Sequence, residues 1–150
     1  MLYKEEVKDL FSVSDDYYLV HCISSDFGMG KGIVVEFNKR FDMKNKLVSK
    51  YHSFVKYWDF EEDEKKGTCL LEGRVFNLIT KRNYWHKPNY KTVRNALEGM
   101  KVLCINNKVE KLAMPKIAAG LDQLQWDKVS EIIKEVFNDM DIEILVCKQN

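Results

Sequence analysis

The chain has 150 residues, of which 45% are apolar and 31% charged, and its formal net charge is +1. This length fits one domain with a sizeable core, so we expect a single domain over residues 1–150. The near-neutral charge excludes the strongly basic surface of a dedicated nucleic-acid domain, and no apolar run approaches the roughly 20 residues of a membrane span.

Short runs of strand-forming residues follow one another along the chain. Residues 17–23 and 75–80 are almost continuously apolar, as in central strands that are covered on both faces. Residues 69–71 lie just before Gly73 and fit a hairpin partner of the second run. Shorter strands are predicted at residues 112–114, before Pro115, and at residues 142–147.

Apolar residues recur every three or four positions in the intervening segments, which is typical of amphipathic helices. Strands that alternate with helices predict a largely parallel sheet with helices on both faces and ligands beyond the carboxyl ends of its strands. The polar stretch at residues 59–67 is interpreted as a solvated loop. The helical stripes cover residues 33–41, 43–51, 90–104 and 126–137, and Asn89 is placed to cap the third of them.

The spacing of cysteines and histidines argues against a disulfide framework and a zinc site. The cysteines lie among apolar residues without a Cys-x-x-Cys pair, which predicts reduced, buried thiols in a cytoplasmic protein. The scattered histidines form no i, i+4 pair, so we expect no metal. The first residues, with Lys4-Glu5-Glu6, are too polar for a signal peptide. The four cysteines are Cys22, Cys69, Cys104 and Cys147, and the three histidines are His21, His52 and His86.

The loop after the first predicted strand, residues 24–32, is a candidate ligand site. Gly28, Gly30 and Gly32 all fall within it, although the chain has only seven glycines. Glycine lets backbone amides approach a ligand closely, and a helix that begins near Gly32 would direct its positive end at a phosphate. The spacing matches neither a Walker loop nor the Rossmann fingerprint, so the run alone fits an ordinary turn equally well.

Two further loops carry one candidate catalytic residue each. Lys81 directly follows an apolar strand, where partial shelter favours a nucleophilic amine, although a lysine at a strand end also commonly extends into solvent. Asp122 follows the small residues of the 115–121 loop, whose main-chain N–H groups suit a ligand, but it also fits a helix cap or a surface carboxylate. Tyr84 and Trp85 are interpreted as packing under the loop that follows Lys81.

Three sequence features occur in order: His21-Cys22-Ile23-Ser24 with Met29-Gly30-Lys31-Gly32-Ile33; Leu78-Ile79-Thr80-Lys81 with His86-Lys87-Pro88; and Met114-Pro115-Lys116-Ile117 with Gly120-Leu121-Asp122 and Leu124-Gln125-Trp126. Together they resemble the macrodomain superfamily, specifically its terminal ADP-ribose protein glycohydrolase branch. The likeness runs from about Val7 to Val146, and the joint match is specific although each motif alone is not.

The resemblance implies a macrodomain fold, which is an α/β, three-layer α/β/α sandwich with a mixed central sheet and a surface cleft for ADP-ribose. It implies a hydrolase that removes ester-linked mono-ADP-ribose from acidic side chains of proteins, with O-acyl-ADP-ribose as a related substrate. Lys81 matches the nucleophile, which attacks C1″ of the distal ribose, and Asp122 matches the aspartate that completes the reaction. We expect ADP-ribose and mono-ADP-ribosylated proteins as partners, no metal, cofactor or membrane, and a monomer.

The same matching implies which residues contact ADP-ribose. Asp9 and Leu10 are expected at the adenine, where the aspartate meets the exocyclic amine, and Gln149 is expected near the adenosine. The first loop is expected along the distal ribose and phosphates, and the second is expected to bind the phosphates. The loop residues are Ser24, Gly30, Gly32 and Ile33 in the first, and Lys116, Ile117, Ala118, Ala119, Gly120 and Leu121 in the second.

The chain also departs from the branch. Ala118-Ala119-Gly120 stands where the branch usually has Gly-Cys-Gly, and we expect the two methyl groups to be tolerated and to narrow the cleft. Lys31 replaces a small residue, which bears on distal-ribose contacts and the choice of leaving group. The Asn-Ala-Asn run and triple glycine of the commoner hydrolytic macrodomains are missing, which favours a lysine mechanism over an activated water.

Other functions remain open from the sequence. Release of ADP-ribose from nucleic acid is the related alternative, and a basic surface around Lys81, Arg82, Lys87 and Arg94 would support it. A module that only binds ADP-ribose is the rival from another class, although binding alone needs neither Lys81 nor Asp122. A phosphatase for ADP-ribose 1″-phosphate and an unrelated α/β domain are the remaining readings.

Overall fold

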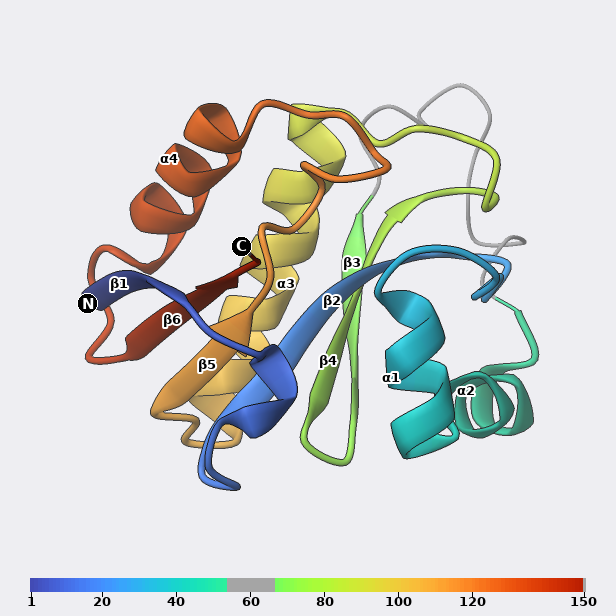
Figure 1. The fold of residues 1–150 in the computed structure, drawn as a ribbon, viewed down its shortest axis with the longest axis horizontal. Helices are drawn as coiled ribbons and strands as arrows, with labels where there is room; N and C mark the ends of the chain where they lie inside the picture. Colours follow the sequence, from blue (N-terminus) through green and yellow to red (C-terminus); the bar gives the residue numbers. More distant parts are fainter. Residues whose placement is uncertain (54–66, 150) are drawn as a thin grey trace.

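The computed structural model describes residues 1–53 and 67–149, which form one six-stranded sheet between two layers of helices (Figure 1). The strand order is β1-β6-β5-β2-β4-β3, and every neighbouring pair is parallel except the β3–β4 hairpin. The α/β sandwich with a mixed central sheet is thereby confirmed. The strands are β1 (Leu2–Val7), β2 (Tyr18–Ser24), β3 (Thr68–Glu72), β4 (Val75–Lys81), β5 (Lys111–Met114) and β6 (Glu143–Lys148).

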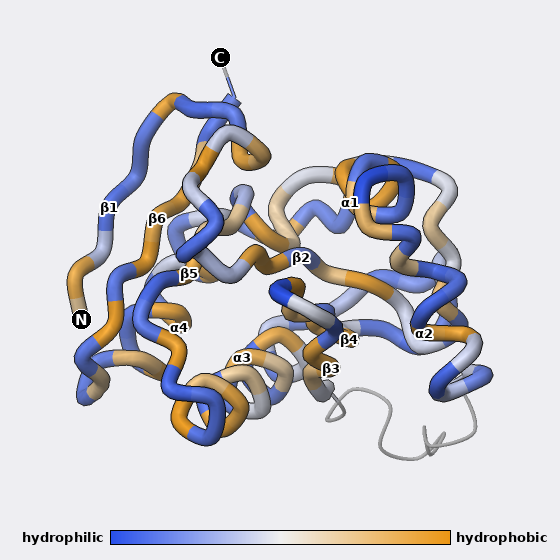
Figure 2. Tube along the Cα trace, turned by 90° about the horizontal axis from the view of Figure 1, so that it is seen from below, coloured by the Kyte–Doolittle hydropathy of each residue, from blue (hydrophilic) through white to orange (hydrophobic). Residues whose placement is uncertain are grey.

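Two pairs of helices cover the two faces of the sheet, and a short 3-10 turn follows β1. Side chains of the central strands alternate between the two cores, so Leu19 and Ile23 pack with α1 and α2 whereas Val20 packs with α3. Figure 2 shows the resulting hydrophobic segments along the inner strands. The helices are α1 (Val34–Phe41), α2 (Met43–Tyr51), α3 (Tyr90–Asn106) and α4 (Trp126–Phe137), and the turn is η1 (Leu10–Ser12).

All the helices and strands that the sequence predicts are present, with ends that differ by at most two residues. Asn89 caps α3 as predicted, because its Oδ1 accepts from the Thr92 N–H at 2.9 Å and Thr92 Oγ1 accepts from the Asn89 N–H at 3.1 Å. The solvated loop predicted at residues 59–67 lies outside the described residues, apart from Gly67. That residues 1–150 form one domain stays a prediction.

The edge strand β1 is absent from the sequence prediction. Its residues are mostly polar and exposed, so neither a continuous apolar run nor an apolar alternation marks it. Parallel pairing with β6, in which Leu2 lies opposite Glu143, makes it a strand despite this composition. None of the helices in the described residues combines the length and the apolar character that crossing a bilayer requires.

A buried polar pair joins β2 to β4 beside α1. His21 Nε2 and Asn77 Oδ1 are 2.6 Å apart at paired register positions, and both side chains are fully buried. The His21 ring stacks on Phe37 of α1, with ring centroids 3.9 Å apart. Burial lowers the pKa of His21 to about 4, because the imidazolium would lose its hydration, although the contact with Asn77 opposes the shift. His21 is therefore a neutral structural residue at pH 7.

This environment predicts a loss of stability in acid. The unfolded chain protonates His21 near pH 6.5 and the folded chain only near pH 4, so the stabilisation is complete above pH 6.5 and is lost as the pH falls toward 4. Between pH 7.5 and 5, the free energy of unfolding in urea should fall by about 2 kcal/mol from this group. The control variant His52→Gln, at an exposed position, should show the same fall in unfolding free energy as wild type. If His21→Gln showed an equal fall, the loss of stability in acid would not come from His21.

Candidate functional site

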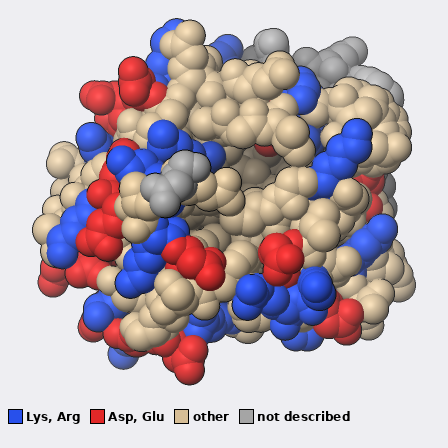
Figure 3. All heavy atoms as spheres, viewed as in Figure 1, with Lys and Arg blue, Asp and Glu red and all other residues tan. Residues whose placement is uncertain are grey.

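An open cleft of about 1490 Å³ lies at the carboxyl ends of β2, β4 and β5, where the candidate loops are predicted. Every residue predicted for binding or catalysis, from Asp9 to Gln149, lines this one cleft, although their roles stay predictions. Figure 3 shows the hollow in the middle of one face, with Lys and Arg side chains on both sides. Pockets for drug-sized ligands measure about 300–1,000 Å³, so this cleft has room for a dinucleotide.

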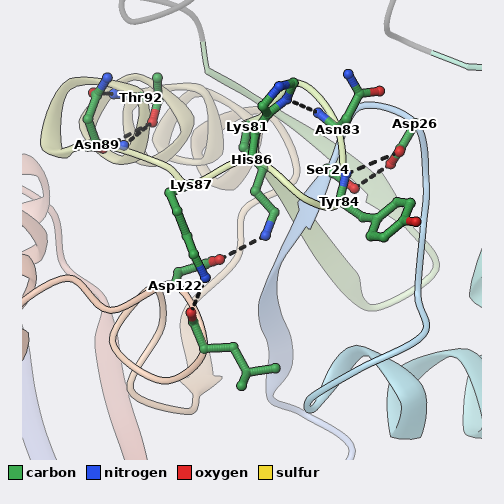
Figure 4. A network of polar contacts seen from close by, with 11 residues as sticks. Ser24, Asp26, Lys81, Asn83, Tyr84, His86, Lys87, Asn89, Thr92 and Asp122 are labelled. Atoms are coloured by element: carbon green, nitrogen blue, oxygen red, sulfur yellow. Dashed lines mark hydrogen bonds and ion pairs between the residues drawn. The ribbon is translucent and has the colours of Figure 1, made fainter.

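Lys81 and Asp122 meet inside the cleft. The Lys81 Nζ donates to Asp122 Oδ1 at 2.8 Å, and the two side chains are only 16% and 14% exposed. Figure 4 shows the Lys81 side chain running from the end of β4 to Asp122 in the β5–α4 loop. Because β2 lies between β4 and β5, the contact crosses the end of the middle strand. A lysine with a carboxylate in hydrogen-bond reach is what an amine nucleophile and its base require.

Asp26, which the sequence pattern did not single out, braces two of the loops. Its Oδ1 accepts from the Gly28 N–H at 3.0 Å and from the Ser24 hydroxyl, and its Oδ2 accepts from the Tyr84 N–H at 3.1 Å. Glycine is required at position 28, where the β2–α1 loop meets the β4–α3 loop, because a Cβ there would lie 2.9 Å from the Cβ of Tyr84. The available sequence signal was the aspartate two residues before a glycine, which is a turn pattern.

The β5–α4 loop folds back on itself. The Leu124 N–H donates to the Ala118 carbonyl at 2.9 Å, and the Gln123 N–H donates to the Gly120 carbonyl at 3.1 Å. Ala118 has a φ of +59°, a left-handed conformation that costs an L-residue other than glycine roughly 1–2 kcal/mol. The alanine is therefore accommodated with backbone strain at a position where the branch usually has glycine.

A second group of lining residues comes from η1 and the end of β6. Asp9 caps η1, because its Oδ1 accepts from the Phe11 N–H at 3.0 Å, and Leu10 is only 4% exposed. Phe11 lines the cleft beside them, with the Arg40 guanidinium 4.4 Å from its ring centroid. Gln149 lies exposed at the rim. Phe11 was missed from the sequence because nothing in its local pattern separates it from a core phenylalanine.

The lining of the cleft is rich in cations although the whole chain is nearly neutral. Cations outnumber carboxylates there, which concentrates positive potential and favours an anionic ligand such as a pyrophosphate. The sequence placed Arg94 with Lys81 in a candidate basic surface. In the structure Arg94 instead forms an ion pair with Glu135 of α4. The lining cations are Lys8, Lys31, Arg40, Lys44, Lys81, Lys87, Lys116 and Lys148, and the carboxylates are Asp9, Glu36 and Asp122.

Cys22 reaches the cleft from β2, next to the Lys81–Asp122 pair. All four cysteines are free, and Cys22 is half-buried whereas the others are buried. Burial raises the pKa of the Cys22 thiol to about 12, and the charge of Asp122 adds to the shift, so this group stays a neutral thiol. Within residues 1–53 and 67–149, no group of three or more His, Cys, Asp or Glu side chains is placed to hold a metal ion.

Tyr84 and Trp85 correct one interpretation made from the sequence. Each side chain is 63% exposed, so packing beneath the loop is wrong. The reason is the close approach of the two loops, because Asp26 holds the Tyr84 N–H and Gly28 lies directly against the Tyr84 Cβ. The pair instead lines the rim of the cleft, with ring centroids 5.0 Å apart.

Comparison with known proteins finds close relatives in sequence, although no family model matches. The chain is 42% identical to the ADP-ribose glycohydrolase OARD1 of Bos taurus over 142 residues, covering 92% of this chain and 86% of the relative. Identity to the Homo sapiens protein of the same name is 40% with the same coverage. A DNA ADP-ribosyl glycohydrolase of Thermus aquaticus is 23% identical over 136 residues, covering 85% of this chain and 36% of that protein.

Solved structures share the fold at much lower identity. The macrodomain of Thermus aquaticus DarG matches with a TM-score of 0.78 and 20% identity, covering 97% of both chains. The macrodomain of Mycobacterium tuberculosis DarG matches with a TM-score of 0.76 and 17% identity, covering 99% of this chain and 98% of that one.

The left-handed alanine predicts that Ala118→Gly stabilises the protein. Relief of the strain should exceed the entropy that glycine adds to the unfolded chain, so the free energy of unfolding in urea should rise by ~0.5 kcal/mol. Ala119→Gly is the matched control, because Ala119 is not left-handed and should lose stability on the same change. A loss of stability in both variants would show that strain at Ala118 is not the governing factor.

Proposed function

This chain belongs to the macrodomain family, in the branch of the ADP-ribose glycohydrolases. We propose that it is a hydrolase that releases ADP-ribose from an ester on acidic side chains of proteins. The observation that carries the proposal is the Lys81–Asp122 pair, with 2.8 Å between Nζ and Oδ1, in an electropositive cleft. The cations suit the pyrophosphate, and the pair supplies a nucleophile with its base.

The first step needs Lys81 as a neutral amine, because an ammonium has no lone pair. Asp122 lies in position to take the proton through the existing hydrogen bond. The amine then attacks C1″ of the distal ribose, and the C1″–N bond forms as the C1″–O bond to the acyl group breaks. The bonding electrons leave with the carboxylate of the acidic side chain, so the leaving group needs no proton.

The second step releases the sugar from Lys81. The glycosylamine first opens to a protonated Schiff base: the nitrogen lone pair forms the C1″=N bond, the bond from C1″ to the ring oxygen breaks, and that oxygen takes a proton from the nitrogen. Water then adds to C1″, the C1″–N bond breaks, the freed aldehyde closes to the ribose ring again, and Asp122 returns its proton to the departing amine, which restores the ion pair. The net change consumes one water and one ester and gives ADP-ribose, a carboxylate and a proton. Low exposure of both side chains limits competition from bulk water for the hydrogen bond between them.

The proposal also covers the partners of the enzyme, its active form and its location in the cell. We take mono-ADP-ribosylated proteins as the partners, a monomer as the active form and the cytoplasm as the location, where the free thiols of the four cysteines suit a reducing environment. The cations that line the cleft also favour ADP-ribosylated nucleic acid as a second substrate class.

The proposal predicts that Lys81→Ala abolishes release of ADP-ribose from a protein mono-ADP-ribosylated on glutamate. Binding of free ADP-ribose should stay within a few-fold of wild type, because the nucleophile supplies chemistry rather than most of the contacts. Lys91→Ala, at an exposed position of α3 outside the cleft, is the matched control and should release ADP-ribose at the wild-type rate.

Full activity in Lys81→Ala would overturn the lysine mechanism. No release by wild type, with ADP-ribose binding intact, would exclude the protein ester as substrate. The same assay with ADP-ribosylated single-stranded DNA would then separate a nucleic-acid hydrolase from a module that only binds ADP-ribose.

A further inference from the structure

Lys87, in the β4–α3 loop, reaches the same β5–α4 loop as Lys81, which ends β4. The Lys87 Nζ donates to the main-chain carbonyl of Leu121 at 2.6 Å, and Leu121 directly precedes Asp122. Figure 4 shows the Lys81 and Lys87 side chains both extending toward Asp122 and its loop. The end of β4 and the loop that follows it therefore contact two consecutive residues of the β5–α4 loop through two separate cations.

The backbone that carries Lys87 is fixed on both sides. Before it, the His86 N–H donates to the Asn83 carbonyl at 3.0 Å, and His86 Nδ1 accepts from the Asn83 N–H at 3.1 Å. After it come the buried Pro88 and Asn89, which caps α3. Lys87 thus extends from an ordered turn next to a helix start.

The segment that Lys87 holds has little packing of its own. A Cβ at Gly120 would meet no atom within 4 Å, and the Leu121 side chain is 59% exposed. Side-chain burial therefore contributes little to fixing the main chain just before Asp122. Hydrogen bonds to that main chain must do so, and the bond from Lys87 is attached one residue away from the reacting carboxylate.

We propose that Lys87 is a positioning residue for the hydrolase reaction. Its ammonium holds the Leu121 carbonyl so that the Asp122 carboxylate stays within hydrogen-bond reach of the Lys81 amine. The inference rests on the proposed function, in which that hydrogen bond moves the proton. Misplacement of a reacting group by about 1 Å can cost 10²-fold in rate, so a loose loop lowers kcat rather than substrate affinity.

The kinetic test compares Lys87→Met, Lys87→Arg and Lys91→Met on the glutamate-linked substrate. We expect Lys87→Met to lower kcat about tenfold while KM and the Kd for free ADP-ribose rise by less than about threefold, since it removes one of the eight cations that line the cleft. Lys87→Arg keeps a cationic donor and should recover most of the activity. Lys91→Met removes an exposed lysine outside the cleft and should behave as wild type.

Two kinetic outcomes would overturn the proposal. A tenfold rise in KM or in the Kd for ADP-ribose, with kcat preserved, would make Lys87 a direct ligand contact. An unchanged kcat in Lys87→Met would show that Asp122 needs no such support.

Amide hydrogen exchange tests the same contact without catalysis. Exchange at the Gln123 and Leu124 amides, which are bonded within the loop, should be about tenfold faster in Lys87→Met and unchanged in Lys91→Met. Equal protection in Lys87→Met and wild type would overturn the holding role. If wild type released no ADP-ribose, the proposed function would fail while this exchange measurement would still decide whether Lys87 fixes the loop.

Discussion

The contact between Lys81 and Asp122 depends on the parallel pairing of β5, β2 and β4 more than on any local feature. Parallel neighbours bring their carboxyl ends to the same edge of the sheet, so a residue that ends β4 can reach the loop after β5 across the end of β2. The two residues are 41 positions apart in the chain. The braces from Asp26 and Lys87 hold the loops that complete this arrangement.

The same arrangement decides which group in the cleft can act as a nucleophile. The Cys22 thiol is close to the pair, but burial and the Asp122 charge raise its pKa to about 12 and keep it protonated. Lys81 already donates a hydrogen bond to the Asp122 carboxylate, so one proton transfer along that bond would yield the amine that the proposed mechanism needs. Lysine chemistry therefore needs no rearrangement of the described residues, whereas thiolate chemistry would need a new charge environment.

The sequence is informative where a periodic pattern reports burial. The stripes of α3 and α4 and the apolar runs of β2 and β4 are visible because each packs against a continuous core. β1 was missed because it is a polar edge strand. Asp26 was missed because its bond to Tyr84 spans 58 positions of the chain, and Phe11 because its aromatic partner, Phe37, lies in the distant helix α1. The positions of Lys81 and Asp122 could be inferred from the family resemblance, whereas the support from Lys87 required the folded loops.

Chemical trapping decides whether Lys81 bonds covalently to the distal ribose during turnover. Sodium borohydride added during turnover should reduce the Schiff base between Lys81 and C1″, giving wild type a mass increase of one ADP-ribosyl unit plus two hydrogens, which peptide mapping assigns to Lys81. Lys81→Ala should show no such adduct. An active wild type that gives no adduct, or an adduct on a different lysine, would rule out Lys81 as the nucleophile.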